Sequence, residues 1–213
     1  MAYNSYRPSQ SATPVVLNLI IINVIVFIAQ MVFDPSGLDI FGTTRFGWLT
    51  SRLGLYSFDS GLFNPYQLIT HMFAHGGYLH IIFNMYALWL FGAVLEKTWG
   101  PKRFLIFYFV CGIGAGITQA LLVSGGPAIG ASGAVMGLLA AFAYTFPNVE
   151  FYILPIPFPI KAKYLAIIYA AIDIFGGFSG GGDNVAHFAH LGGLAMGFIL
   201  AMIWNKTDKQ TRY

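Results

Sequence analysis

Long runs of apolar residues without a charge are the feature that most constrains this chain. The first run, Pro14 to Phe33, contains twenty residues and no Asp, Glu, Lys or Arg. A helix of that length rises about 30 Å, the thickness of the hydrocarbon core of a bilayer. Similar runs recur along the chain as far as residue 204, and 9% of all residues are charged, against about 25% in soluble domains. The sequence therefore predicts an integral membrane protein.

We predict one all-α membrane domain, a bundle of six transmembrane helices, over residues 14–204. The expected spans are 14–33, 78–95, 104–123, 127–146, 164–178 and 185–204. Residues 1–13 and 205–213 are polar and are expected to be short cytoplasmic tails. Because no small-x-small cleavage pattern follows the first run, we interpret it as a retained helix and not as a signal peptide.

Two connections differ from simple turns. Residues 34–77 contain no sustained span but many aromatic and leucine side chains, so we expect a long first loop of short amphipathic helices at the membrane surface. Residues 147–163 carry four prolines, which exclude a continuous helix there.

The basic residues are distributed asymmetrically across this predicted topology. Nine lie on the side of the termini and two on the other side, which places the termini in the cytoplasm by the positive-inside rule. The two exceptions are Arg45 and Arg52. The net charge of +3 is scattered, so it does not indicate nucleic-acid binding. The single cysteine, Cys111, allows no disulfide framework and no thiolate metal cluster.

One serine stands in an unusual context inside an apolar run. Ser132 precedes Gly133 and Gly137, whose spacing creates a groove where a second helix can approach closely. The last span has the same spacing at Gly193 and Gly197, and His190 lies one turn before it. If the two grooves face each other, Ser132 meets His190, as a nucleophile must meet its base.

Helix geometry places three polar side chains at one depth. Ser132, His190 and Asn84 come out about 9, 8 and 9 Å below the outer surface. Polar groups at such a depth usually face a water-filled interior, so we expect a cavity open to the outside. His80 lies one turn before Asn84 on the same face, and both can donate hydrogen bonds to a developing oxyanion.

These residues resemble the rhomboid family of intramembrane serine proteases. Four motifs lie in order on the expected helices: His-x-x-x-Asn at residues 80–84, Gly-x-x-x-Glu-x-x-x-Gly at 92–100, Gly-x-Ser-Gly at 130–133 and Ala-His-x-x-Gly-x-x-x-Gly at 189–197. The resemblance extends from His71 to Gly197. Met136 stands where some members carry a tyrosine that stacks on the histidine, which leaves the orientation of His190 open.

The resemblance implies a serine endopeptidase that needs no cofactor or metal. Ser132 would be the nucleophile and His190 the base in a dyad, while His80, Asn84 and the backbone N–H groups of Ala131 and Ser132 would bind the oxyanion. The family's substrates are transmembrane proteins, reached within membrane lipid. The small six-helix form is similar to bacterial members, which predicts the bacterial cytoplasmic membrane, with the active site opening to the outer side. The substrate and the oligomeric state stay open.

Other roles are possible for several polar residues. His187 is an alternative base, although it lies out of step with Gly193, and Asp173 would complete a triad if it reached His190. His71 and His75 have the i, i+4 spacing of zinc ligands but lack the glutamate of a metalloprotease helix, so we interpret them as hydrogen-bond anchors. Glu96 is expected to fix the second loop, with Lys102 or Arg103 as its partner.

Two other functions compete with proteolysis. A non-catalytic rhomboid-like protein would bind membrane helices without cutting them, but it would have no need of both Ser132 and His190. A membrane electron carrier would hold haem between histidines of two helices, with His80, His187 and His190 as candidate ligands. That alternative leaves Ser132 and its glycines without a role, and a Soret band in the purified protein would support it.

Overall fold

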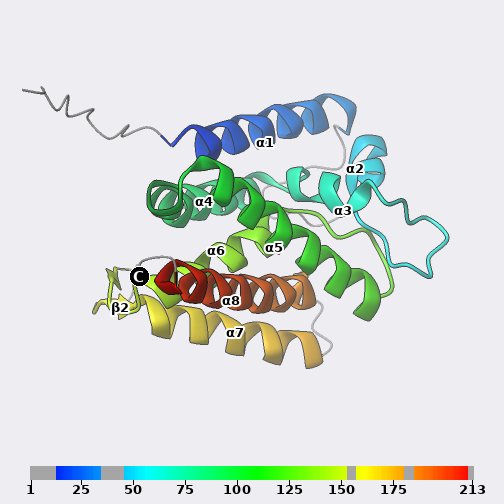
Figure 1. Ribbon diagram of the computed structural model, residues 1–213. Coiled ribbons are helices and arrows are strands. Elements are labelled where there is room, and N and C mark those ends of the chain that lie inside the picture. The colour runs from blue at the N-terminus through cyan, green and yellow to red at the C-terminus, as the bar shows by residue number, and fades with distance from the viewer. Residues whose placement is uncertain (1–12, 35–45, 153–156, 180–184, 211–213) are drawn as a thin grey trace, which may run out of the picture.

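The long helices of the chain pack as a bundle with α1 at one edge and α7 at the other (Figure 1). A computed structural model describes residues 13–34, 46–152, 157–179 and 185–210. The long helices are α1 (Pro14–Phe33), α4 (Tyr78–Trp99), α5 (Pro101–Leu122), α6 (Ser132–Thr145), α7 (Ala162–Phe178) and α8 (His187–Gln210). The short elements are α2 (Trp48–Leu53), α3 (Gln67–Thr70), the 3-10 helix η1 (His71–Phe73), β1 (Glu150–Phe151) and β2 (Ile160–Lys161).

Four of the described helices, α1, α4, α5 and α8, are long and apolar enough to cross a membrane. Helix α6 has 14 residues and α7 has 17, so α6 rises about 21 Å, less than the hydrocarbon core. That the chain crosses the membrane six times therefore stays a prediction. The all-α expectation needs one correction, because β1 and β2 pair antiparallel in the proline-rich connection, Glu150 opposite Lys161.

Helix α6 begins at Ser132, later than the predicted start of its run at residue 127. The preceding residues bond to the first loop instead of continuing a helix: Leu55 and Ala128 exchange backbone hydrogen bonds of 2.9 and 2.8 Å. The N–H of Gly130 donates to the carbonyl of His71 at 2.8 Å. Gly130 has a backbone φ angle of 121°, which residues with a side chain rarely adopt. The nucleophile candidate therefore starts its helix from a loop held at two points.

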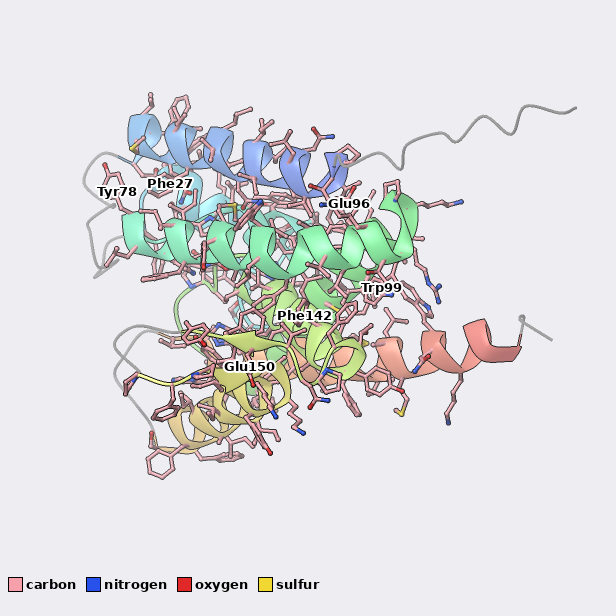
Figure 2. All side chains as sticks on the ribbon, turned by 90° about the vertical axis from the view of Figure 1, so that its left-hand side faces the viewer. Phe27, Tyr78, Glu96, Trp99, Phe142 and Glu150 are labelled. Carbon is pink, nitrogen blue, oxygen red and sulfur yellow. The ribbon has the colours of Figure 1, made fainter. Side chains whose placement is uncertain are left out.

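Helix α4 was predicted to end at residue 95 but continues to Trp99. Its Glu96 is buried and accepts the backbone N–H groups of Val15 and Val16 at 3.0 and 2.9 Å. These are free amides of the first turn of α1, where a carboxylate also meets the positive end of the helix dipole. Figure 2 shows Glu96 beside the start of α1. Glu96 thus caps α1, a role that the sequence analysis did not predict.

The remaining boundaries differ from the predicted spans by a few residues. Helix α5 starts at residue 101 and ends at 122, against the predicted 104–123. Helix α7 starts at residue 162, against 164, and α8 runs from 187 to 210, against 185–204. Pro101 is the first residue of α5, where its missing N–H costs no helical hydrogen bond.

The first loop is tied to α1 by two buried polar side chains. The amide of Gln30 accepts the backbone N–H of His75 at 3.0 Å and donates to its carbonyl at 3.1 Å. The carboxylate of Asp34 accepts the N–H groups of Leu49 and Thr50 at 2.8 and 2.7 Å, so it caps α2. The backbone of His75 therefore makes the anchoring bonds at this junction.

His71 anchors the same region from the other side. Its Nδ1 hydrogen-bonds the Gln67 carbonyl at 2.7 Å, and its ring packs against Gly116 of α5, where a methyl group would come within 2.9 Å of it. Burial lowers the pKa of His71 to about 4, although the bond to Gln67 opposes the shift. His71 is therefore neutral in the folded protein at pH 7.

Helices α6 and α8 approach through the predicted glycine grooves. A methyl group on Gly193 would overlap the carbonyl oxygen of Gly133, and one on Gly197 would overlap that of Gly137. On its other face, α6 packs Gly137 against Cys111 of α5, where a methyl group would lie 2.6 Å from the sulfur. The absence of side chains at these positions lets the backbones touch.

We predict that Gly193→Ala destabilises the protein, because the added methyl must separate α6 from α8. Overpacking of this kind costs about 1–3 kcal/mol. The midpoint of thermal unfolding in detergent should fall clearly below that of the wild type. Ala195→Val adds two methyl groups on the exposed side of the same helix and should leave the midpoint nearly unchanged. Equal midpoints for the two variants would contradict the predicted packing.

His71 predicts a dependence of stability on pH. In the unfolded chain the imidazole binds a proton below about pH 6.5, whereas in the folded protein it does so only below about 4. The free energy of unfolding must therefore decrease as pH falls from 6.5 to 4, by up to about 1.4 kcal/mol per pH unit for one proton. Thermal midpoints of His71→Gln measured over this window should fall less steeply than those of the wild type. Parallel curves would refute the assignment.

Candidate active site

Ser132 and His190 meet as the glycine spacing predicts. Ser132 is the first residue of α6 and His190 lies in the first turn of α8. The Ser132 Oγ is 2.8 Å from the His190 Nε2, a hydrogen bond between side chains 58 residues apart. Both residues are partly buried. The hydroxyl and the imidazole therefore already have the separation that proton transfer requires.

The orientation of His190, which the sequence left open, follows from its second nitrogen. The His190 Nδ1 lies 3.0 Å from the Asp173 Oδ1 of α7. Because a carboxylate oxygen accepts, Nδ1 carries the hydrogen and donates it. The Nε2 of the neutral ring is then a lone pair that accepts the Ser132 hydroxyl proton.

His80 of α4 is held in the opposite tautomer. The backbone N–H of Gly76 donates to the His80 Nδ1 at 3.3 Å, so the hydrogen of the neutral ring lies on Nε2. That Nε2 lies 2.6 Å from the point where a Gly130 Cβ would stand, and the Ser132 Oγ lies 3.7 Å from the same point. His80 thus directs an N–H donor into the space beside the serine, which the absence of a side chain on Gly130 leaves open.

Asn84 is buried one turn further along α4. Its Nδ2 donates to the carbonyl oxygen of His80 at 2.8 Å, within its own helix. An amide nitrogen has two hydrogens, so this bond uses one of them. The structure brings Asn84 to the same face of α4 as His80, and an oxyanion role would depend on the second hydrogen.

The start of α6 adds backbone donors. Ala131 is the N-cap residue and Ser132 the first helical residue, so their N–H groups have no carbonyl partner within the helix. The positive end of the helix dipole lies at the same place. Helix α8 is positioned here by Gln119 of α5, whose Oε1 accepts the N–H of Ala189 at 3.1 Å.

The Nδ1 of His187 lies 2.8 Å from the Asp173 Oδ1, whereas the Ser132 Oγ is hydrogen-bonded to His190. The geometry therefore favours His190 over His187 as the base.

The sequence did not predict the roles of Gly76 and Gln119, which no motif marks. The sequence shows Asp173 as a charged residue inside an apolar run, but it does not show that its carboxylate lies within hydrogen-bond distance of His190. Within the described residues no group of three His, Cys, Asp or Glu side chains is placed to hold a metal ion.

Comparison with known proteins identifies relatives of this chain. The family model described as Rhomboid domain matches residues 62–206. The chain is 34% identical over 143 residues to RHOMBOID-like protein 6, mitochondrial, of Arabidopsis thaliana, which covers 65% of this chain and 43% of the relative. It is 34% identical over 137 residues to Rhomboid protease GluP of Bacillus subtilis, covering 64% and 25%.

A third relative is Rhomboid protein 1, mitochondrial, of Saccharomyces cerevisiae, 30% identical over 152 residues, covering 68% of this chain and 44% of the relative. The chain thus spans less than half the length of these three relatives. The matched region contains Ser132, His190 and the helix of His80. The resemblance expected from the four motifs is confirmed, and the chain belongs to the rhomboid family.

Proposed function

We propose that this protein is an intramembrane serine endopeptidase that cleaves transmembrane segments of membrane proteins. The observation that carries the proposal is the 2.8 Å hydrogen bond between the Ser132 Oγ and the His190 Nε2. Family membership supports it, since rhomboid proteases act on transmembrane substrates within the membrane. The name of one relative, Rhomboid protease GluP, agrees with this reaction class.

In the proposed reaction the Ser132 Oγ attacks the scissile carbonyl carbon while its proton passes to the His190 Nε2. The carbonyl oxygen becomes an oxyanion, which the His80 Nε2–H, the Asn84 amide and the N–H groups of Ala131 and Ser132 stabilise. His190 then gives the proton to the leaving amine, and an acyl-enzyme remains on Ser132. Water, deprotonated by His190, hydrolyses the ester and restores the free hydroxyl.

The proposed substrates follow from the chemistry of a membrane helix. The carbonyls of a regular helix are bonded within the helix, so a nucleophile reaches them only where the helix unwinds. Small or helix-breaking residues near the membrane surface make unwinding easier. We therefore propose transmembrane segments with such residues near their outer end as substrates.

We further propose that α6 and α7 complete a set of six spans with α1, α4, α5 and α8. The nine-to-two distribution of basic residues supports cytoplasmic termini and an active site that opens to the outer side. The relatives include bacterial and mitochondrial proteins. The bacterial cytoplasmic membrane remains our proposal for the location.

A fluorophosphonate probe should label the wild-type protein covalently at Ser132, because the oxygen of an activated serine attacks the probe phosphorus and displaces fluoride. Ser132→Ala removes the nucleophile and His190→Ala removes the base, so both variants should lose labelling and cleavage of a transmembrane peptide. Gel fluorescence and mass spectrometry of the labelled peptide measure the result. Persistent labelling of Ser132→Ala would show that the nucleophile is another residue, and an unlabelled, inactive wild type would favour the non-catalytic alternative.

His80→Ala and Asn84→Ala test the oxyanion donors. Loss of one such donor lowers kcat by about 10²-fold or more, while KM should change little because the donor acts mainly in the transition state. Ile82→Ala, on the exposed face of the same helix, serves as the control and should keep the wild-type kcat. If Asn84→Ala lowers the thermal midpoint but not kcat, then Asn84 is structural and its second hydrogen has no catalytic role.

A further inference from the structure

Asp173 is a buried charged residue on the otherwise apolar C-terminal half of α7. The outer half of this helix exposes large apolar side chains, among them Ile172, Ile174 and Phe175 at 54, 51 and 78%. The buried residues of α7 are Ala162, Leu165 and Asp173, so its C-terminal half buries one side chain, a carboxylate. A charge at membrane depth is costly and marks a functional site unless a partner explains it.

The partners of Asp173 both lie on α8. Its Oδ1 accepts the Nδ1–H of His187 at 2.8 Å and that of His190 at 3.0 Å. Two donors on one oxygen offset much of the cost of burying the charge. Its Oδ2 has no hydrogen-bond partner within the described residues. Among the described residues, the two imidazoles therefore hold the carboxylate, and one of these imidazoles is bonded to Ser132.

The backbone of α7 is shaped to receive this pair. A methyl group on Gly176 would overlap the ring of His187, and one on Gly177 would lie 3.2 Å from the ring of Phe188. Gly176 is one turn after Asp173, on the same face of the helix. The glycines let α8 approach closely enough for both histidines to reach the carboxylate.

We propose that Asp173 is a positioning residue for catalysis, which makes the reaction centre a Ser132–His190–Asp173 triad carried by three helices. The proposal rests on the proposed peptidase function. Asp173 fixes the hydrogen of His190 on Nδ1, keeps Nε2 as the acceptor facing Ser132, and stabilises the imidazolium that forms when His190 takes the serine proton. His187 is the second donor that holds the carboxylate in place.

The competing explanation is that Asp173 only pins α7 to α8. The two explanations differ for Asp173→Asn, which preserves the size of the side chain. An amide can donate to the His190 Nδ1, which moves the ring hydrogen to Nε2, where it opposes the serine proton. A pinning role would be largely preserved in this variant, whereas a positioning role would be lost.

The test compares Asp173→Asn and Asp173→Glu with Leu165→Ala, which loosens α7 through an apolar contact far from the histidines in sequence. Each variant is purified as the full chain in detergent. Measurements are kcat and KM on a transmembrane peptide, the rate of fluorophosphonate labelling, the thermal midpoint, and the ¹⁵N spectrum of the histidine rings. His190→Gln assigns the signal of His190.

For Asp173→Asn we expect kcat and the labelling rate to fall at least about 10²-fold, since the corresponding change in soluble serine proteases costs about 10⁴-fold. KM should change less than about threefold, as expected for a group that acts in the transition state. The His190 signal should move from the Nδ1–H to the Nε2–H tautomer. Asp173→Glu should recover part of kcat, and Leu165→Ala should lower the midpoint with a smaller loss of kcat and no change of tautomer.

The proposal is overturned if Asp173→Asn keeps kcat within about twofold of the wild type, if its loss of kcat only matches that of Leu165→Ala, or if the tautomer of His190 does not change. Failure of the peptidase proposal looks different. In that case the wild type is neither labelled nor active, while the ring spectra still report whether Asp173 sets the tautomer of His190.

Discussion

The contact between the backbones of α6 and α8 is the constraint on which the rest of the site depends. The four glycines remove the side chains that would separate the helices, so the carbonyl oxygens of Gly133 and Gly137 lie against Gly193 and Gly197. Ser132 and His190 each lie within about one turn of this contact, which leaves their side chains a single common space. Apolar side chains gain little from helix association in lipid, so close backbone packing supplies much of the attraction. The short serine–histidine distance is thus a consequence of the glycine spacing.

His80 and His190 are held in opposite tautomers by the groups that contact their rings. The backbone N–H of Gly76 fixes the lone pair of His80 at Nδ1, and the carboxylate of Asp173 fixes the hydrogen of His190 at Nδ1. Each imidazole therefore presents a different Nε2 to the serine, a donor from His80 and an acceptor from His190. In the proposed reaction the oxyanion requires the donor and the nucleophile requires the acceptor. The hydrogen-bond partner of each Nδ1 thus determines whether the Nε2 of that histidine donates or accepts.

The sequence predicted those features that depend on local spacing. The glycine repeat indicated which faces of α6 and α8 meet, and the order of the motifs indicated the family. It did not predict that α6 begins only at Ser132, because the bonds from Leu55 to Ala128 and from Gly130 to His71 join segments distant in the chain. The cap of α1 by Glu96 spans 80 residues and leaves no local signal. Asp173 was visible as a charge, but its distance to His190 depends on how α7 packs on α8, which periodicity does not determine.

Helix α7 is attached to the bundle differently from α5, α6 and α8. Those three meet through glycine and alanine contacts, whereas α7 lies at the edge of the bundle (Figure 1). Helix α7 exposes most of its large side chains. Because lipid solvates such side chains as well as a neighbouring helix does, apolar contact alone holds a peripheral helix weakly. The bond from His187 to Asp173 is buried and that from His190 is partly buried, at 2.8 and 3.0 Å, so they supply the attraction that the apolar face cannot. The same carboxylate therefore holds the C-terminal half of α7 against α8 and orients the imidazole beside Ser132, and a displacement of α7 would change both together.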